Sequence, residues 1–139
     1  MGEVKVDHIG IATKSIKDGS LIWEILGFTG SGEEIVADQG VKVKIFSAGQ
    51  GTKIELLEPL GEETPIGKFI KKRGQGIQQL AISVNDIKKT ILELKNMNIQ
   101  LINEVPTKGA NDNLIAFIHP SSTGGILIEL VEKINNSQK

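Results

Sequence analysis

The sequence predicts an α+β fold built from two copies of one module, and three observations favour this interpretation. Each half of the chain reads as a strand, one main helix and further short strands separated by turns. The segment "VDHIGIATKSIKD" (6–18) resembles "IQQLAISVNDIKK" (77–89), which lies 71 residues later. The segment "KIELLEP" (53–59) resembles "LIELVEK" (127–133), which lies 74 residues later. Two similar separations favour a duplication over the chance similarity of short apolar strands.

Composition narrows the class of protein. With 139 residues, 39% of them hydrophobic, the chain suits a single domain with its own core. The 16 basic and 17 acidic residues nearly cancel, and no basic tract with aromatic residues suggests a nucleic-acid partner. Cysteine is absent, which excludes disulfides, cysteine-bound zinc and thiol nucleophiles. Apolar runs are too short to cross a bilayer and no signal peptide is apparent, so we expect a cytoplasmic protein without a membrane partner.

The first module is expected at about residues 4–60. Alternating polar and apolar residues predict a strand at 3–12. Ser15 is a suitable N-cap for a helix that continues through Leu26, and Gly27 follows where a left-handed residue is expected. Two further strands are predicted, at 41–49 and 52–59.

A short connecting helix is predicted at about 64–74. Thr64 would cap it, Pro65 would occupy its first position, and Gly74 would end it. Its apolar face is formed by Ile66, Phe69 and Ile70.

The second module is expected at about 76–132. A strand at 77–84 leads to a helix at 86–96, whose apolar positions follow helical spacing at Ile87, Ile91 and Leu94. Three more strands are predicted, at 99–104, 113–118 and 125–132, with an irregular segment at 105–113 and a frayed tail at 133–139. No GxGxxG or P-loop motif is present, which argues against a parallel nucleotide-binding sheet.

Four polar residues fall on the strand faces that point away from the predicted helices. Strand side chains alternate between faces, so where apolar neighbours such as Ile9 pack on a helix, the adjacent polar residue points the other way. These four residues, two from each module, are His8, Glu55, Gln79 and Glu129. If the modules curve toward one another, the four side chains converge in one cleft.

Such a cleft would suit a divalent metal ion. Two partly buried carboxylates cost free energy unless a positive charge compensates them. One imidazole, two carboxylates and one amide oxygen form a mixed set of ligands that suits Co²⁺, Mn²⁺, Ni²⁺, Zn²⁺ or Fe²⁺ with five or six ligands. Taken singly, each residue would read as a structural histidine or a solvated polar residue. The symmetry of the set favours the metal site.

At these residues the chain resembles the vicinal oxygen chelate superfamily, which includes glyoxalases, bleomycin resistance proteins and dioxygenases. Within it, the chain resembles the methylmalonyl-CoA epimerase family over about residues 4–132. The resemblance implies two pseudo-symmetric βαβββ modules that form a cupped mixed sheet around a metal cleft. It rests on the segments "VDHIGIA" (6–12), "QGVKV" (39–43), "TKIELLEPLG" (52–61), "TPIGKFIKKRGQG" (64–76), "NEVPTKGA" (103–110), "IAFIHP" (115–120) and "STGGILIEL" (122–130).

The resemblance also implies a ligand set for the metal. Three family ligands carry over to His8, Glu55 and Glu129, while the fourth, a histidine in the family, is Gln79 here. An amide oxygen is a weaker ligand than imidazole for late transition metals, so we expect looser metal binding. Gln78 replaces a second family histidine and is expected near the site or at its polar rim. Co²⁺ is the first choice of metal, with Mn²⁺, Ni²⁺ and Zn²⁺ as alternatives.

The activity that the resemblance implies is interconversion of (2R)- and (2S)-methylmalonyl-CoA. The proton at C2 would be removed and returned through a metal-stabilised enolate, with Glu55 and Glu129 as the catalytic acid and base. The partner is a small-molecule acyl-CoA, and a homodimer is expected. The resemblance implies that some family members use a proposed carboxylate base at the position of Val43, which this chain, with valine there, cannot use. The basic residues at 71–73 read more simply as a solvated helix end than as coenzyme A contacts.

Three alternatives compete with the epimerase. A glyoxalase I-like lactoylglutathione lyase would share the metal set and the proton transfer. A non-catalytic small-molecule binding module on the same fold is a second alternative, favoured by the change at Gln79. An extradiol dioxygenase requires two histidines and one carboxylate on iron, which Gln79 does not permit.

Overall fold

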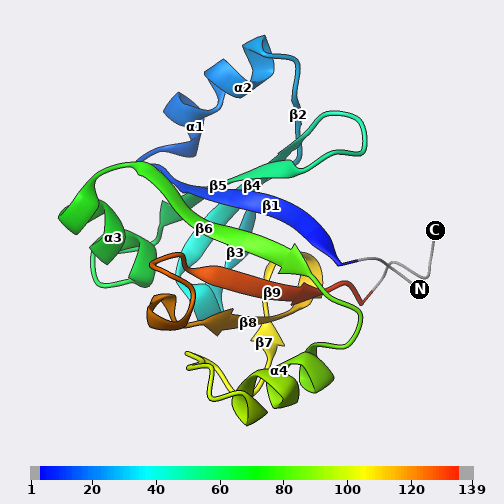
Figure 1. Ribbon diagram of the computed structural model, residues 1–139. Coiled ribbons are helices and arrows are strands. Elements are labelled where there is room, and N and C mark those ends of the chain that lie inside the picture. The colour runs from blue at the N-terminus through cyan, green and yellow to red at the C-terminus, as the bar shows by residue number, and fades with distance from the viewer. Residues whose placement is uncertain (1–3, 135–139) are drawn as a thin grey trace. The chain divides into compact units, whose positions relative to one another are not determined.

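The computed structural model describes residues 4–134 and confirms the α+β class (Figure 1). The chain divides into two compact units, one formed by His8–Gln78 and the other by the chain up to Asp7 together with the chain from Gln79 onward. We call these the first and the second unit. Within the described residues, no helix is long and apolar enough to cross a membrane.

The first unit contains a mixed sheet. Strand β1 pairs in parallel with β5, β5 pairs antiparallel with β4, and β4 pairs antiparallel with both β2 and β3. The strands are β1 (Lys5–Ala12, which begins in the second unit), β2 (Thr29–Gly30), β3 (Glu34–Val36), β4 (Val41–Ser47) and β5 (Lys53–Pro59). The predicted strands at 41–49 and 52–59 are therefore confirmed, apart from their end residues.

The helix predicted from Ser15 to Leu26 is wrong as a single helix. It is broken at Ser20 into α1 (Ile16–Gly19) and α2 (Leu21–Ile25). The Ser20 hydroxyl donates a hydrogen bond to the backbone carbonyl of Ile16 at 2.5 Å, and so competes with the backbone N–H that would bond there in a continuous helix. The residue before it is a glycine, which has low helix propensity, so both effects favour a break at this point. The predicted cap is confirmed, because the Ser15 side chain accepts a hydrogen bond from the backbone of Asp18.

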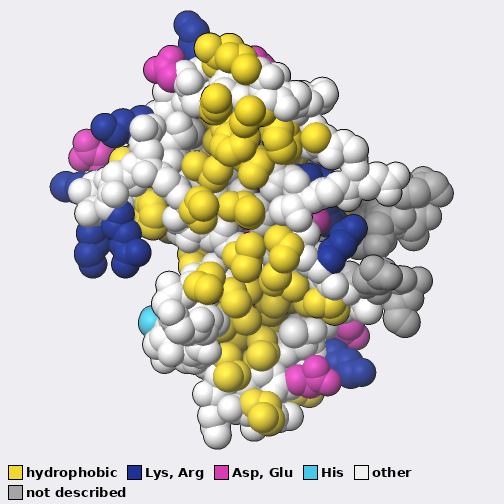
Figure 2. Space-filling model, turned by 45° about the horizontal axis from the view of Figure 1, so that its top comes forward, with side chains coloured by type: hydrophobic (Ala, Val, Ile, Leu, Met, Phe, Trp, Pro, Cys, Tyr) yellow, Lys and Arg dark blue, Asp and Glu magenta, His cyan; other side chains and the backbone are white. Residues whose placement is uncertain are grey.

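Apolar side chains of α2 and the residue after it lie in solvent. We call this group the α2 apolar patch: Leu21, Ile22, Ile25 and Leu26, each more than half exposed. Figure 2 shows hydrophobic side chains gathered at the top of the view, where α2 lies in Figure 1. Contiguous apolar surface of this kind usually marks a contact with another molecule.

The connecting helix α3 (Pro65–Arg73) forms as predicted. The Thr64 hydroxyl accepts a hydrogen bond from the backbone of Gly67, and Pro65 occupies the first turn, where its missing N–H costs nothing. Gly74 follows the last helical residue with φ 80°, a conformation that favours glycine. A side chain at Gly67 would collide with the backbone of the turn before the helix, so this glycine allows close packing.

The second unit repeats the arrangement of the first. Strand β6 pairs in parallel with β9, β9 pairs antiparallel with β8, and β8 pairs antiparallel with β7. Its elements are β6 (Gly76–Ser83, whose first three residues lie in the first unit), α4 (Ile87–Asn96), β7 (Thr107–Lys108), β8 (Leu114–Ile118) and β9 (Ile128–Glu132). Three short 3-10 helices lie among residues 4–134 of the two units, at Ala37–Gln39, Ala110–Asp112 and Pro120–Ser122.

The strand predicted at 99–104 does not form. Leu101 makes only an isolated bridge to Ile118. Two residues on, the side chain of Asn103 accepts a hydrogen bond from the backbone N–H of Phe117 at 2.9 Å, in the place where a strand would offer a backbone carbonyl.

Three short strands were not predicted. The strand β7 lies in the segment predicted to be irregular, and β2 and β3 are too short to show an alternating pattern. Residue 3 of the first predicted strand and 135–139 of the predicted tail lie outside the described residues.

Strand register supports the predicted duplication. In the first unit, Gly10 of β1 lies opposite Glu55 of β5; in the second, Ala81 of β6 lies opposite Glu129 of β9. These positions are separated by the same 71 and 74 residues as the similar sequence segments. Each parallel strand pair is therefore built from equivalent residues.

The helix starts are equivalent as well. The side chain of Asp86 caps the start of α4, just as the side chain of Ser15 caps the start of α1. The backbone N–H of Ile16 at the start of α1 donates to the Glu58 carboxylate at 2.8 Å, and that of Ile87 at the start of α4 donates to the Glu132 carboxylate at 2.9 Å. Each carboxylate lies near the end of a central strand. It accepts a hydrogen bond from a backbone N–H of the first helical turn, which has no partner within the helix.

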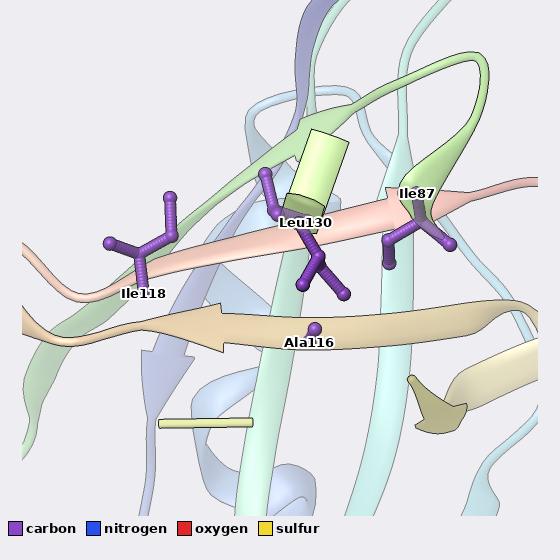
Figure 3. Packing of buried hydrophobic residues seen from close by; sticks show 5 residues of the cluster. Ile87, Ala116, Ile118 and Leu130 are labelled. Carbon is purple, nitrogen blue, oxygen red and sulfur yellow. The ribbon is translucent and has the colours of Figure 1, made fainter. Parts of the chain in front are cut away.

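Each unit has an apolar cluster between its sheet and its helix. In the first unit the buried members are Ile16, Phe46, Ile54 and Leu56, with Ile9, Ile11, Trp23 and Phe28 packed against them. In the second unit they are Ile87, Ile91, Ala116, Ile118 and Leu130, with Leu94 and Ile128 among their neighbours (Figure 3). The predicted helix-facing positions are confirmed for the strands β1, β5 and β9. The polar residues between them therefore point to the opposite face of each sheet.

Candidate metal centre

The first unit holds a buried imidazole–carboxylate pair. His8 Nε2 on β1 lies 3.2 Å from Glu55 Oε1 on β5, and each residue is only 6% exposed. The residue opposite Glu55 on β1 is Gly10, which has no side chain to fill the space beside the carboxylate. The parallel pairing of β1 with β5 thus brings an imidazole and a carboxylate together on the face that the helices leave open.

The second unit holds a buried amide–carboxylate pair at the equivalent positions. Gln79 Nε2 on β6 donates to Glu129 Oε1 on β9 at 2.5 Å, and both residues are buried. Because the amide nitrogen donates to the carboxylate, the amide oxygen is the atom that would bind a cation. His8 thus corresponds to Gln79, and Glu55 corresponds to Glu129.

Apolar side chains surround each carboxylate on the neighbouring strands. Glu129 lies opposite Phe117 of β8, and the same face carries a buried cluster of Ala81, Ile115 and Val131. In the first unit, Glu55 lies opposite Ile45 of β4. A carboxylate that is buried among apolar groups costs several kcal/mol, on the order of 3–5, when its compensating charge is missing. These two sites therefore favour a bound positive charge.

Three further residues on or beside these strands have defined places. Gln78 is partly buried, and among the described residues its Oε1 atom is buried without a hydrogen-bond partner. Val43 is buried opposite Leu57 in the β4–β5 ladder, where it contributes only apolar surface. His119 Nδ1 accepts a hydrogen bond from the backbone of Ser121 at 3.0 Å, which fixes the turn after β8.

Sequence reasoning missed Gln75, which ties the end of the connecting helix to the first strand. Its Oε1 atom accepts hydrogen bonds from the backbone of Lys14 at 2.7 Å and from the hydroxyl of Thr13 at 3.3 Å. The available signal was its position between two glycines in "GQG", which lets the backbone turn sharply on both sides. Glu58 and Glu132 were also missed as helix supports, although both stand three residues after the carboxylates of the candidate site.

Comparison with known proteins gives a consistent result. A model of the Glyoxalase/Bleomycin resistance protein/Dioxygenase superfamily matches residues 7–117. Among curated relatives, an uncharacterized protein of Bacillus subtilis, YqjC, is 42% identical over 129 residues, covering 92% of this chain and 91% of the relative. The mitochondrial methylmalonyl-CoA epimerase of Dictyostelium discoideum is 33% identical over 135 residues, covering 96% and 81%. The ethylmalonyl-CoA/methylmalonyl-CoA epimerase of Cereibacter sphaeroides is 33% identical, covering 91% and 96%.

Solved structures agree with the sequence relatives. The methylmalonyl-CoA epimerase of Mycobacterium tuberculosis is 39% identical, with a TM-score of 0.87 over 91% of this chain and 86% of that one. A methylmalonyl-CoA epimerase in complex with methylmalonyl-CoA and NH₄⁺ is 27% identical, with a TM-score of 0.89 over 96% of both chains.

Proposed function

We propose that this chain, which belongs to the Glyoxalase/Bleomycin resistance protein/Dioxygenase superfamily, is a metal-dependent methylmalonyl-CoA epimerase. It would interconvert the (2R) and (2S) epimers by exchanging the proton at C2. The observation that carries the proposal is the presence of two buried ligand pairs at equivalent positions of the two repeats, His8 with Glu55 and Gln79 with Glu129. The named epimerases among its relatives and structural neighbours supply the reaction.

The residues fit a divalent metal ion. His8, Glu55 and Glu129 are buried, and we propose that each supplies one ligand to the ion, with the amide oxygen of Gln79 as a fourth. Two carboxylates balance a charge of +2, while imidazole and amide add neutral ligands. We propose Co²⁺ as the metal, with Mn²⁺, Ni²⁺ and Zn²⁺ as alternatives. When bound, the ion would supply positive charge for the thioester and carboxylate oxygens of the substrate.

Glu55 and Glu129 are the proposed catalytic acid and base. Epimerisation breaks the C2–H bond, moves its electron pair toward the thioester carbonyl, and then forms a C2–H bond on the opposite face. One carboxylate would dissociate from the metal and accept the first proton while the other carries and donates the second, so the two are not both charged ligands during the reaction, and the roles exchange with its direction. Their place on equivalent strands of a duplicated fold makes them a matched pair. His8 and Gln79 would orient them through their contacts with the carboxylate oxygens.

The proposal includes the assembly and location of the protein. We propose that residues 1–139 act as one domain in which both modules supply ligands to the same ion. We also propose a cytoplasmic homodimer, and the α2 apolar patch supports self-association. A glyoxalase I-like lyase or a non-catalytic binding module would share the fold, but the named relatives are epimerases.

The test follows (2R)-methylmalonyl-CoA in D₂O by mass spectrometry and NMR. The protein is stripped of metal with a chelator and reloaded separately with Co²⁺, Mn²⁺, Ni²⁺ or Zn²⁺. We expect metal-dependent gain of deuterium at C2 together with appearance of the (2S) epimer. The metal-free protein serves as the control.

Absence of exchange with every metal would contradict the epimerase. A parallel assay with the hemithioacetal of methylglyoxal and glutathione then identifies the lyase, since that reaction would use the same set of metal ligands. Tight binding of a substrate without turnover in either assay would instead favour the binding module.

A further inference from the structure

We propose that a row of basic side chains on α3 binds the phosphate groups of the coenzyme A substrate. We call this row the α3 basic stripe: Lys68, Lys71, Lys72 and Arg73. The inference rests on the proposed function and extends it to the far end of the substrate, away from the metal ligands.

The charge of the stripe is concentrated and uncompensated. It holds 4 of the 16 basic residues of the chain within six consecutive positions, and all four side chains are exposed. Within residues 4–134 none of the four takes part in an ion pair, whereas Lys42, Lys95 and Lys133 do. Figure 2 shows Lys and Arg side chains gathered at the left of the view, where α3 lies in Figure 1.

The helix arranges these charges on the side that faces solvent. Lys68, Lys71 and Lys72 follow the spacing i, i+3, i+4, which places them together on one face. Ile66 on the other side of α3 is buried. The guanidinium of Arg73 lies over the ring of Phe69, 5.9 Å from its centre, which holds the last cation close to the stripe.

Helix stability alone does not explain the stripe. Basic residues in the last turn stabilise a helix through its dipole, and Lys71, Lys72 and Arg73 stand there. Lys68 lies in the middle of the helix, however, and its like-charge neighbours at i+3 and i+4 destabilise the helix. A bound polyanion would relieve this repulsion.

The stripe lies at a suitable separation from the ligand pair of the first unit. Gln75, two residues after the stripe, is hydrogen-bonded to Thr13 and Lys14 at the end of β1. His8 lies five residues before Thr13 on this extended segment, which spans about 16 Å. From the thioester sulfur to the first phosphorus of coenzyme A there are about thirteen bonds, which span about 15 Å when extended, as a peptide of four to five residues does.

The chemistry of the stripe matches the phosphates. Lysine ammonium groups act as point charges for phosphate, and an arginine can bind two phosphate oxygens at once. Coenzyme A carries a diphosphate and a 3′-phosphate, so several exposed cations are needed to neutralise it. Because the stripe is in solvent, the attraction must weaken with added salt.

The test compares the triple variant Lys68→Ala/Lys71→Ala/Lys72→Ala with the double variant Lys88→Ala/Lys89→Ala, which removes exposed cations from α4. Alanine favours helix, so α3 should persist, which circular dichroism checks. Steady-state kinetics are measured with methylmalonyl-CoA and with methylmalonyl-pantetheine, which lacks the phosphates. We expect the triple variant to raise KM for the CoA thioester about tenfold at low ionic strength, with little change for the pantetheine thioester. The double variant should change neither.

Binding of coenzyme A itself, measured by calorimetry, separates this inference from the proposed function because it requires no turnover. Weaker binding by the triple variant alone, with a difference that shrinks as salt rises, supports the stripe even if no epimerisation occurs. Equal binding by the triple variant and the unmodified protein would overturn the inference. An equal rise in KM for both thioesters would also overturn it, since the effect would not come from the phosphates.

Discussion

His8 and Gln79 occupy equivalent positions of the two repeats, yet one is an imidazole and the other an amide. Each contacts the carboxylate of the parallel neighbouring strand, so both keep the geometry of a ligand pair. As proposed ligands they would differ in strength, because an amide oxygen binds late transition metals more weakly than an imidazole nitrogen. The asymmetry of the site is therefore chemical, while its strand geometry is repeated.

Replacing the amide by an imidazole should strengthen metal binding. We expect Gln79→His to lower the Kd for Co²⁺ and Zn²⁺ at least tenfold, measured by competition with a chelating dye. Gln78→His is the matched control, because the adjacent strand residue points to the other face of the sheet. Unchanged affinity in Gln79→His, or an equal gain in the control, would contradict the assignment of Gln79 as a ligand.

Removing either carboxylate should abolish proton exchange. We expect Glu55→Ala and Glu129→Ala each to lower the rate of deuterium incorporation by a factor of about 10²–10⁴, the usual contribution of a general acid or base. Glu93→Ala, which removes an exposed carboxylate from α4, should keep full activity. Full activity in either site variant would refute the acid–base pair.

At the scale of elements, carboxylates three residues after the site residues support the helices. Glu58 and Glu132 accept the first backbone hydrogen bonds of α1 and α4, so each central strand carries both a proposed catalytic residue and a helix support. The two faces of each central strand have different roles. Ile54 and Leu130 pack toward helices, while the carboxylates beside them in sequence point to the open face.

The helix support can be tested at Glu132. We expect Glu132→Ala to lower the free energy of unfolding by about 1–2 kcal/mol, because the buried start of α4 loses its acceptor. Chemical denaturation measures the change. Glu132→Gln is the control, since its amide oxygen still accepts the hydrogen bond and should recover at least half of the loss. Equal losses in both variants would mean that the charge matters and the hydrogen bond does not.

For the whole molecule, the prediction concerns the homodimer. Light scattering coupled to gel filtration should give twice the 15.0 kDa of one chain. With a net charge of −1, charge repulsion does not oppose association, and the α2 apolar patch offers surface to bury. We expect Ile25→Glu to yield a monomer, whereas Leu92→Glu, at another exposed position on α4, should leave the dimer intact. A monomeric unmodified protein would contradict the homodimer.

Where periodicity is long and capped, the sequence predicted the elements well. The helix α3 begins after its predicted cap Thr64, and α4 begins at Ile87, one residue after its predicted start, because a capping side chain and apolar spacing agree at both places. Predictions from local sequence patterns were wrong where a single side chain forms a hydrogen bond to the backbone and so changes the local structure. The break of the first helix depends on the hydroxyl of Ser20, and the missing strand at 99–104 on the amide of Asn103. Either residue could equally have pointed to solvent.

The sequence by itself determined the duplication, the α+β class and the identity of the four candidate ligands, because alternation and repeat spacing are properties of the chain. Only the tertiary structure decided which ligands are partners. His8 meets Glu55, and Gln79 meets Glu129, because β1 pairs in parallel with β5 and β6 with β9 in equivalent registers. Strand pairing joins residues that lie 47 and 50 positions apart. Its register depends on the packing of a whole face against a helix, which no short segment of sequence contains.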